Sequence, residues 1–187
     1  MYSTPDFRKG LRIEMNNEPY IIVDFQHVKP GKGGAFVRTK LKNLLSGNVV
    51  DKTFRSGEKV GKPDIEEKEM QFLYQDGEGH HFMDTATYDQ ITLNEEVIGE
   101  SRNFLQENTN VAILFYQSKP INLELPIFVE LEVTEAEPGI KGDTASGASK
   151  PVTVETGAKI QVPLFIEEGD KLKIDTRTGQ YIERVKT

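Results

Sequence analysis

The stretch "YIIVDFQHVKPGKGGAFVRTKLKNL" (residues 20–44) holds two runs rich in β-branched and aromatic residues on either side of a short glycine-containing loop. Runs of this composition are typical of β-strands, and glycine permits the backbone angles that a tight connection requires. We therefore expect residues 20–28 and 35–44 to pair as a β-hairpin. Residues 29–34 would form the tip of that hairpin.

Similar strand signals recur along the rest of the chain, separated by Gly, Asp, Asn or Pro. They are "MQFLYQ" (70–75), "VAILFY" (111–116), "IFVELEVT" (127–134), "KIQVPLFI" (159–166) and "KLKIDT" (171–176). The pattern predicts an all-β protein. The best helix candidate is residues 94–109, where Val97 with Phe104 and Ile98 with Leu105 share a face, although Gly99 weakens the pattern.

Two prolines mark junctions between segments of different charge. Pro63 and Pro126 divide the 187 residues into 1–63, 64–126 and 127–187, each about sixty residues long. Units of this size with many short strands favour small barrels of the SH3-like or OB type, because closing a sheet removes its exposed edges. We therefore expect three small barrel domains.

Composition excludes some classes of protein. No apolar run is long enough for a bilayer span, and the first ten residues lack the pattern of a signal peptide, so we expect a cytoplasmic protein without membrane association. The absence of cysteine excludes disulfides, thiolate nucleophiles and Cys-ligated zinc. Stability must then come from packing.

The net charge of −7 hides a strong asymmetry along the chain. Residues 1–63 hold 12 basic against 6 acidic residues, a charge of +6, whereas residues 64–126 hold 3 against 13, a charge of −10. Residues 127–187 carry 8 against 11, a charge of −3. A basic first domain followed by an acidic one indicates that one end of the molecule meets phosphates while the middle is kept off them.

The second strand of the hairpin predicts a basic face. Side chains alternate along a strand, so one set points to the core and the other to solvent. The inward set would be Val37, Thr39 and Leu41, and the outward set Arg38, Lys40 and Lys42. Together with Lys32 at the exposed tip, the outward set resembles a surface for an anionic partner.

Lys32 has three interpretations. A phosphate-binding P-loop is disfavoured, because that motif needs a Ser or Thr after the lysine and then a helix, whereas Gly33 and a strand follow here. The lysine could be an ordinary solvated residue of a glycine hairpin. It could also act as a long cationic probe on a narrow tip, or be extended by covalent modification.

Other candidate sites are weaker. His80 and His81 are adjacent in a predicted strand and point to opposite faces, so we expect no metal site there and no cofactor. The loop 142–151 suits contacts to phosphate or ribose, but a plain surface loop is the simpler interpretation. Tyr181 and Arg184 could stack on and pair with nucleic acid, or simply pack.

Several stretches together resemble the bacterial elongation factor P family over essentially the whole chain. They are "HVKPGKGGAFVRTKLKNLLSG" (27–47), "FRSGEKV" (54–60), "FLYQDGEGHHFMD" (72–84), "EPGIKGDTASGASKP" (137–151) and "VPLFIEEGDKLKIDTRTGQYIERV" (162–185). The resemblance implies an all-β chain with an SH3-like, KOW-type N-terminal barrel and two OB-fold barrels in an L-shaped, tRNA-like arrangement. It also implies a factor that is not an enzyme.

The resemblance implies partners as well. Members of the family bind the 70S ribosome beside peptidyl-tRNA in the P site, contact ribosomal RNA near the exit site, and relieve stalling at consecutive prolines. The tip lysine matches Lys32, which in many members is lengthened by a dedicated lysine-modifying enzyme and points toward the peptidyl-transferase centre. The identity of the modification stays open, although a lysine here argues against the arginine-bearing branch. We expect a monomer.

The resemblance and the charge pattern together define the expected site residues. Loop support would come from Pro30, Gly31, Gly33 and Gly34, and contacts to the tRNA backbone from Lys29, Arg38, Lys40 and Lys42. Contacts to the ribosome near the exit site would come from Gly142, Asp143, Thr144, Ser146, Gly147, Lys150, Tyr181 and Arg184. No catalytic residue is expected, because a factor that holds a tRNA end in a productive pose needs no acid or base.

Two alternatives come from other classes. A general barrel protein that binds RNA or single strands away from the ribosome would need aromatic platforms, and the acidic charge of the last two domains disfavours it. An enzyme that uses Lys32 as an amine nucleophile would need that ammonium buried or placed beside other cations, and an exposed tip offers little burial.

Overall fold

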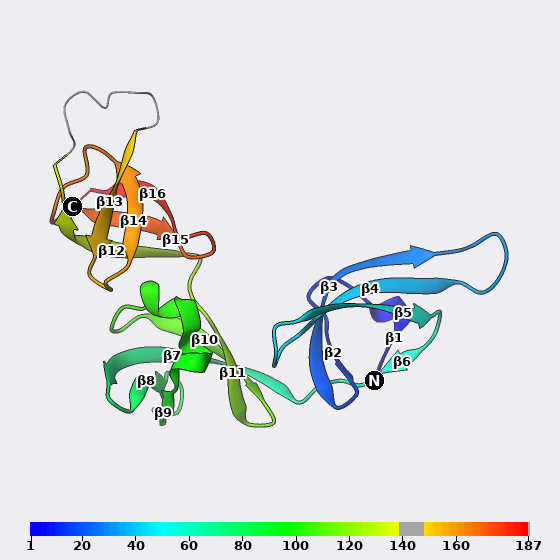
Figure 1. Cartoon of the computed structure of the whole chain (residues 1–187). Coiled ribbons are helices and arrows are strands. Elements are labelled where there is room, and N and C mark those ends of the chain that lie inside the picture. The colour runs from blue at the N-terminus through cyan, green and yellow to red at the C-terminus, as the bar shows by residue number, and fades with distance from the viewer. Residues whose placement is uncertain (139–147, 187) are drawn as a thin grey trace. The chain divides into compact units, whose positions relative to one another are not determined.

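The computed structural model describes residues 1–138 and 148–186, and strands dominate this part of the chain (Figure 1). The all-β prediction is confirmed. The strands form three sheets of four or five strands and one small two-stranded sheet. Among the described residues, no helix has the length and apolar character needed to cross a lipid bilayer.

The first sheet contains the predicted hairpin and has the strand order β2-β3-β4-β5. The strands of this region are β1 (Tyr2–Ser3), β2 (Arg12–Met15), β3 (Glu18–Val28), β4 (Phe36–Asn43), β5 (Val49–Arg55) and β6 (Lys59–Val60), with a 3₁₀ helix η1 (Thr4–Asp6). β1 and β6 pair separately. The core under the sheet is Phe7, Leu11, Ile13, Tyr20, Ile22, Val37, Leu41, Phe54 and Val60. Alternation along the strands produces this single apolar face.

Two five-stranded antiparallel sheets follow. The first has the order β11-β10-β7-β8-β9, and the second has the order β14-β13-β12-β15-β16. The strands of the first are β7 (Ile65–Asp76), β8 (Gly79–Asp84), β9 (Gln90–Leu93), β10 (Asn110–Tyr116) and β11 (Lys119–Glu124). Those of the second are β12 (Phe128–Ala136), β13 (Ser149–Val154), β14 (Lys159–Pro163), β15 (Lys171–Asp175) and β16 (Gln180–Val185).

By its contacts the chain divides into two compact units. One contains Met1–Glu67 and Leu114–Asn122, and the other contains Lys68–Ile113 and Leu123–Thr187. The hairpin of β10 and β11 therefore belongs mainly to the first unit, where the Tyr116 hydroxyl donates to Glu14 Oε1 at 3.1 Å. The division into domains 1–63, 64–126 and 127–187 concerns independent folding, and it stays a prediction.

The predicted helix over 94–109 is wrong in its length. The α-helix α1 covers only Glu95–Ile98, and the 3₁₀ helix η2 covers Gly99–Asn103. The Asn94 side chain caps the start of α1 by accepting from the Val97 amide at 3.2 Å. Gly99 has φ +50°, outside the right-handed helical region, so the α-helix ends there and the chain continues in another direction.

Candidate functional site

The predicted hairpin is confirmed, and its tip is built from residues 29–35. β3 and β4 pair up to Val28 opposite Phe36, which leaves seven residues in the connection. Of the three tip glycines, which are all able to take positive φ, Gly33 does so, at +94°. Gly31 and Gly34 keep ordinary backbone angles and have open space around them. Among the three tip glycines, the backbone conformation therefore favours glycine only at residue 33.

Lys32 projects from this tip into solvent. Its side chain is exposed, as is that of Lys29, while Pro30 is half-buried. Among residues 1–138 and 148–186, no hydrogen bond, ion pair or ring contact reaches the Lys32 ammonium. Among the described residues the lysine is thus an unpartnered cation in the loop that connects β3 and β4, free to pair with an external anion.

β4 alternates as the sequence predicts. Val37, Thr39 and Leu41 are buried, whereas Arg38, Lys40 and Lys42 are exposed. The one polar member of the inward set is satisfied, because Thr39 Oγ1 donates to the Lys52 carbonyl at 2.7 Å. The outward basic face therefore exists, carried by a strand with neighbours on both sides.

The cross-strand neighbours make this face less uniformly basic than a single strand implies. Lys40 lies opposite Asp24 on β3 and opposite Asp51 on β5. Arg38 has the neutral Gln26 and Thr53 in these two positions. Opposite charges in cross-strand positions attract, so Asp24 and Asp51 reduce the net charge around Lys40, whereas Arg38 keeps its charge for an external partner.

A β-bulge on β3 creates the acidic flank. The register shifts between Ile22 and Asp24, so Val23 is the extra residue of β3. Ile22 faces the core, and regular alternation would turn Asp24 the same way. The bulge instead turns Asp24 outward, where its carboxylate lies 3.6 Å from Lys9 Nζ, and turns Phe25 toward the core.

Two residues near the tip escaped the sequence reasoning. Phe36 lies on the outward face, with the Arg38 guanidinium 5.4 Å from its ring centroid, and exposed Arg55 lies opposite Phe36 on β5. A cation over an aromatic ring is held in place by the ring quadrupole. The alternation of β4 already placed Phe36 in phase with Arg38, but Arg55 could be assigned only once the register with β5 was known.

The residues of the sheet β14-β13-β12-β15-β16 that are predicted to contact RNA near the exit site have very different surroundings. Lys150 is buried, with 8% of its surface exposed, and its Nζ donates to the Glu137 carbonyl at 2.6 Å. Tyr181 packs against the apolar core. Arg184 is exposed, with its guanidinium 3.8 Å from Asp170 and 5.3 Å from the Phe165 ring centroid.

The remaining exit-site candidates lie outside the described residues. They are Gly142, Asp143, Thr144, Ser146 and Gly147.

Tyr181 and Arg184 reach the same side of β16 because the register with β15 shifts between Lys173 and Ile174. Arg184 is consequently the one exposed cation among the described members of this set.

A cluster of possible ligands for a cation lies at the turn between β7 and β8. Asp76, Glu78 and His81 place one ligand atom each within 4.8 Å of one another. His81 Nε2 is 2.7 Å from Asp76 Oδ1, and this hydrogen bond lowers the pKa of Asp76. His81 Nδ1 is 3.1 Å from Thr92 Oγ1, so both ring nitrogens already have partners and the cluster acts as a hairpin support.

His80 points away from this cluster into the core. It is buried, and burial lowers the pKa of its imidazole. Its Nδ1 has no hydrogen-bond partner among the described residues. The two adjacent histidines therefore have separate environments, as their opposite directions on β8 predict.

Three family models match the chain, one over the region of each of the three larger sheets. The family "Elongation factor P (EF-P) KOW-like domain" matches residues 3–60, "Elongation factor P (EF-P) OB domain" matches 65–123, and "Elongation factor P, C-terminal" matches 129–184. A protein named elongation factor P from Pelotomaculum thermopropionicum is 58% identical over 99% of this chain and 100% of its own length. The chain belongs to the elongation factor P family.

Other members of the elongation factor P family are similarly close. The one from Natranaerobius thermophilus is 56% identical over 100% of this chain and 99% of its own. Among solved structures, initiation factor 5A from Methanococcus jannaschii aligns with a TM-score of 0.54 and 24% identity, covering 64% of this chain and 88% of that one. These findings confirm a KOW-like domain followed by OB-type sheets, and they make the chain a translation elongation factor by family.

Proposed function

We propose that this chain binds the 70S ribosome beside peptidyl-tRNA in the P site and speeds peptide-bond formation at consecutive prolines. In this proposal Lys32 reaches toward the acceptor end of the tRNA, in the peptidyl-transferase centre. The factor acts in the cytoplasm as a monomer and performs no catalysis of its own. The observation that carries the proposal is the exposed, unpartnered Lys32 at the end of the β3–β4 hairpin.

The shape of the tip supports this role. The last paired residues of β3 and β4, Val28 and Phe36, leave a seven-residue loop that carries Lys32 beyond the paired strands. A positioned cation that holds one reactant raises the rate of a slow step by removing unproductive orientations. The proposal therefore asks the chain for binding and orientation, which need no acid, base or metal.

The basic face supports contact with the tRNA backbone. Lys29, Arg38 and Lys42 have no acidic residue opposite them in the register, and each can pair with a phosphate. Lys40 contributes less, because Asp24 and Asp51 flank it. We therefore assign the tRNA contact chiefly to the end of the face near Arg38, with Lys40 as an auxiliary contact.

Contact with ribosomal RNA near the exit site is assigned to the third domain. Arg184 is exposed and would supply the cation, while buried Lys150 and half-buried Tyr181 would hold the strands that frame the site. Gly142, Asp143, Thr144, Ser146 and Gly147, which lie outside the described residues, complete the proposed set of contacts. The acidic residues of the middle domain would keep that part of the chain off RNA.

An enzyme that modifies Lys32 fits the same geometry. An exposed ammonium that has no hydrogen bond or ion pair among the described residues is open to a modifying enzyme, and any group added there lengthens the tip without disturbing packing. The intact mass of protein purified from its natural host would exceed the unmodified 21.1 kDa chain by the mass of that group. A mass equal to that of the unmodified chain would remove the modifying enzyme from the proposal.

The proposed partner is tested by binding. Full-length protein should bind ribosomes carrying prolyl-tRNA in the P site far more tightly than free tRNA or single-stranded RNA. Lys32→Ala should weaken the ribosome complex, while Lys159→Ala, which removes an exposed lysine of β14, should leave it unchanged. Equal affinity for ribosomes, tRNA and single strands would instead support a general RNA-binding protein.

A further inference from the structure

The end of η2 and the residues after it contact the sheet β14-β13-β12-β15-β16, although the proposed function gives this segment no role. We call residues 103–106 the connector segment. Thr156 Oγ1, from the turn between β13 and β14, donates to the Asn103 carbonyl at 2.6 Å. Gln106 Nε2 donates to Glu155 Oε1 at 2.7 Å. All of these residues lie in the second compact unit of the chain.

Phe104 is the apolar part of the connector segment. Its half-buried ring packs against the core of the sheet β14-β13-β12-β15-β16. The ring also covers the turn between β15 and β16, since its Cζ lies 3.5 Å from the point that a Cβ on Gly179 would occupy. Gly179 has φ +75°, an angle that favours glycine. A side chain from the middle of the sequence thus completes the packing of the third sheet.

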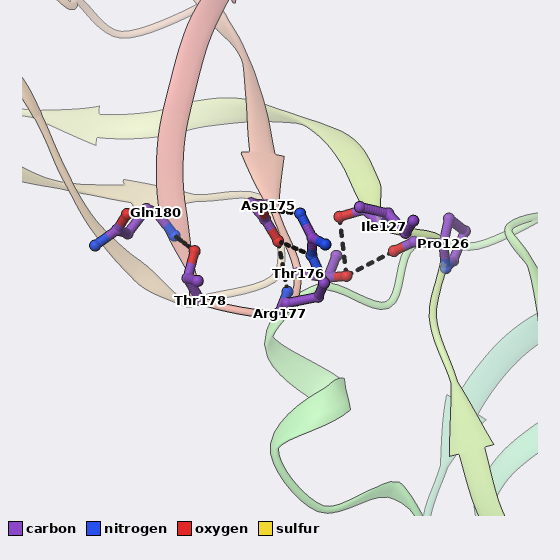
Figure 2. Close-up of polar contacts among 7 residues, drawn as sticks. All are labelled: Pro126, Ile127, Asp175, Thr176, Arg177, Thr178 and Gln180. Atoms are coloured by element: carbon purple, nitrogen blue, oxygen red, sulfur yellow. Dashed lines mark hydrogen bonds and ion pairs between the residues drawn. The ribbon is translucent and has the colours of Figure 1, made fainter. Parts of the chain in front are cut away.

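The other side of the same turn is bonded to the chain that links the two sheets (Figure 2). Thr176 Oγ1 donates to the Pro126 carbonyl at 2.6 Å and lies 3.1 Å from the Ile127 carbonyl. The Thr176 amide donates to the Ile127 carbonyl at 2.8 Å. The turn is therefore fixed from two directions, by the connector segment and by the link at Pro126.

The turn itself is stiffened by an ion pair. Asp175 Oδ1 accepts from the Arg177 amide at 2.8 Å, and Asp175 Oδ2 accepts from Arg177 Nη2 at 2.8 Å, as Figure 2 shows. Thr178 Oγ1 accepts from the Gln180 amide at 3.3 Å. These hydrogen bonds restrict the conformation of the turn, which Phe104 and the Pro126 carbonyl contact.

We propose that the connector segment and this turn form a clasp within the second compact unit, which makes the strands of residues 68–113 and the sheet of residues 128–185 move as one body. Phe104 is then a positioning residue for the ribosome-bound factor, an inference that rests on the proposed function. A factor that orients the tRNA end accelerates peptide-bond formation less when its own domains move relative to one another. Binding to the ribosome then no longer fixes a single geometry. The clasp would therefore affect activity through residues that do not include the Lys32 hairpin.

The test compares two Phe→Ala variants of the full chain. Phe104→Ala removes the ring of the clasp, and Phe128→Ala removes a third-domain ring that is 44% exposed and contacts Lys173 instead. Backbone ¹⁵N relaxation should give one rotational correlation time for both sheets in the wild type and in Phe128→Ala. In Phe104→Ala the two sheets should give different times, and rescue of a polyproline reporter should fall by about tenfold.

Further variants separate positioning from loss of folding. Phe104→Leu keeps an apolar contact and should restore uniform relaxation and most of the rescue. The double variant Gln106→Ala/Thr156→Val removes two hydrogen bonds of the clasp without touching the core, and it should give a smaller change in the same direction.

The outcomes distinguish this inference from the proposed function. Uniform relaxation in both Phe104→Ala and the double variant would overturn the clasp. Separate correlation times with full polyproline rescue would overturn the positioning role of Phe104. Full rescue by Lys32→Ala in the same assay would instead overturn the proposed function, while the relaxation result would still decide whether the clasp exists.

Discussion

Lys32 and Lys150 both have glycines close by in the sequence, and the sequence alone makes both candidates for RNA contacts. In the structure Lys32 is exposed and has no partner among the described residues, whereas Lys150 is buried and its Nζ donates to the Glu137 carbonyl. The composition of a loop therefore does not reveal where a neighbouring ammonium points. What decides is the position of each lysine relative to the strand pattern.

The largest effect on activity is expected from a substitution of Lys32. Lys32→Met removes the charge and keeps the length, so rescue of a polyproline reporter should fall by at least about tenfold. The free energy of unfolding should change by less than about 0.5 kcal/mol, because no contact is lost. Reporter assays and denaturant unfolding of the same preparation check both statements. A large loss of stability would show that Lys32 is a structural residue like Lys150.

The same substitution at Lys150 should do the opposite. Lys150→Met removes a charged donor from the Glu137 carbonyl, which should lower the free energy of unfolding by about 1–3 kcal/mol. The dependence of ribosome binding on salt should stay as in the wild type, since no phosphate contact is lost. A weaker salt dependence with unchanged stability would make Lys150 an RNA contact after all.

The sequence contains the signal that separates these two lysines. Lys150, Val152 and Val154 alternate with the outward-facing residues of β13, and this phase places Lys150 on the buried side. Lys32 lies between strands, where no such phase applies. The buried position of Lys150 was thus predictable from local alternation, as was the split of β4 into an inward and an outward set.

Other features depend on the fold as a whole and could not be predicted locally. The bulge at Val23 and the pairing of Lys40 with Asp24 and Asp51 follow from register, which the residues of β4 alone do not determine. Phe104 fits a helical face in the sequence, yet Gly99 ends α1 and the ring packs against another sheet. Tertiary packing overrode a periodic pattern there.

A smaller effect is expected from comparing two cations of the same face. Arg38→Ala should reduce the slope of log affinity for tRNA against log salt by about 0.7–0.9, the loss of one phosphate contact. Lys40→Ala should change the slope less, because Asp24 and Asp51 lie opposite Lys40 and reduce the net charge around it. Filter binding at several salt concentrations measures both slopes. Equal reductions would show that the flanking aspartates do not matter.

The smallest effect is expected from the ion pair between Asp175, the last residue of β15, and Arg177. Hydrogen bonds from the Arg177 side chain lower the pKa of Asp175. A carboxylate with a lowered folded-state pKa stabilises the protein at neutral pH, and this contribution is lost as the pH falls through that pKa, below about pH 4. Asp175→Asn should therefore destabilise the protein slightly at pH 7 and hardly at all in strong acid. Unfolding at several pH values checks this, and a difference that grows in acid would contradict the ion pair.

The central claim is that an unpartnered cation at residue 32 orients the tRNA end rather than supporting the fold. Its most direct test is the rate of peptide-bond formation between two prolines in a reconstituted translation system, at factor concentrations that saturate the ribosome. We predict that the wild-type protein accelerates the step and that Lys32→Met, although bound, does not. Equal acceleration by both proteins would contradict the account.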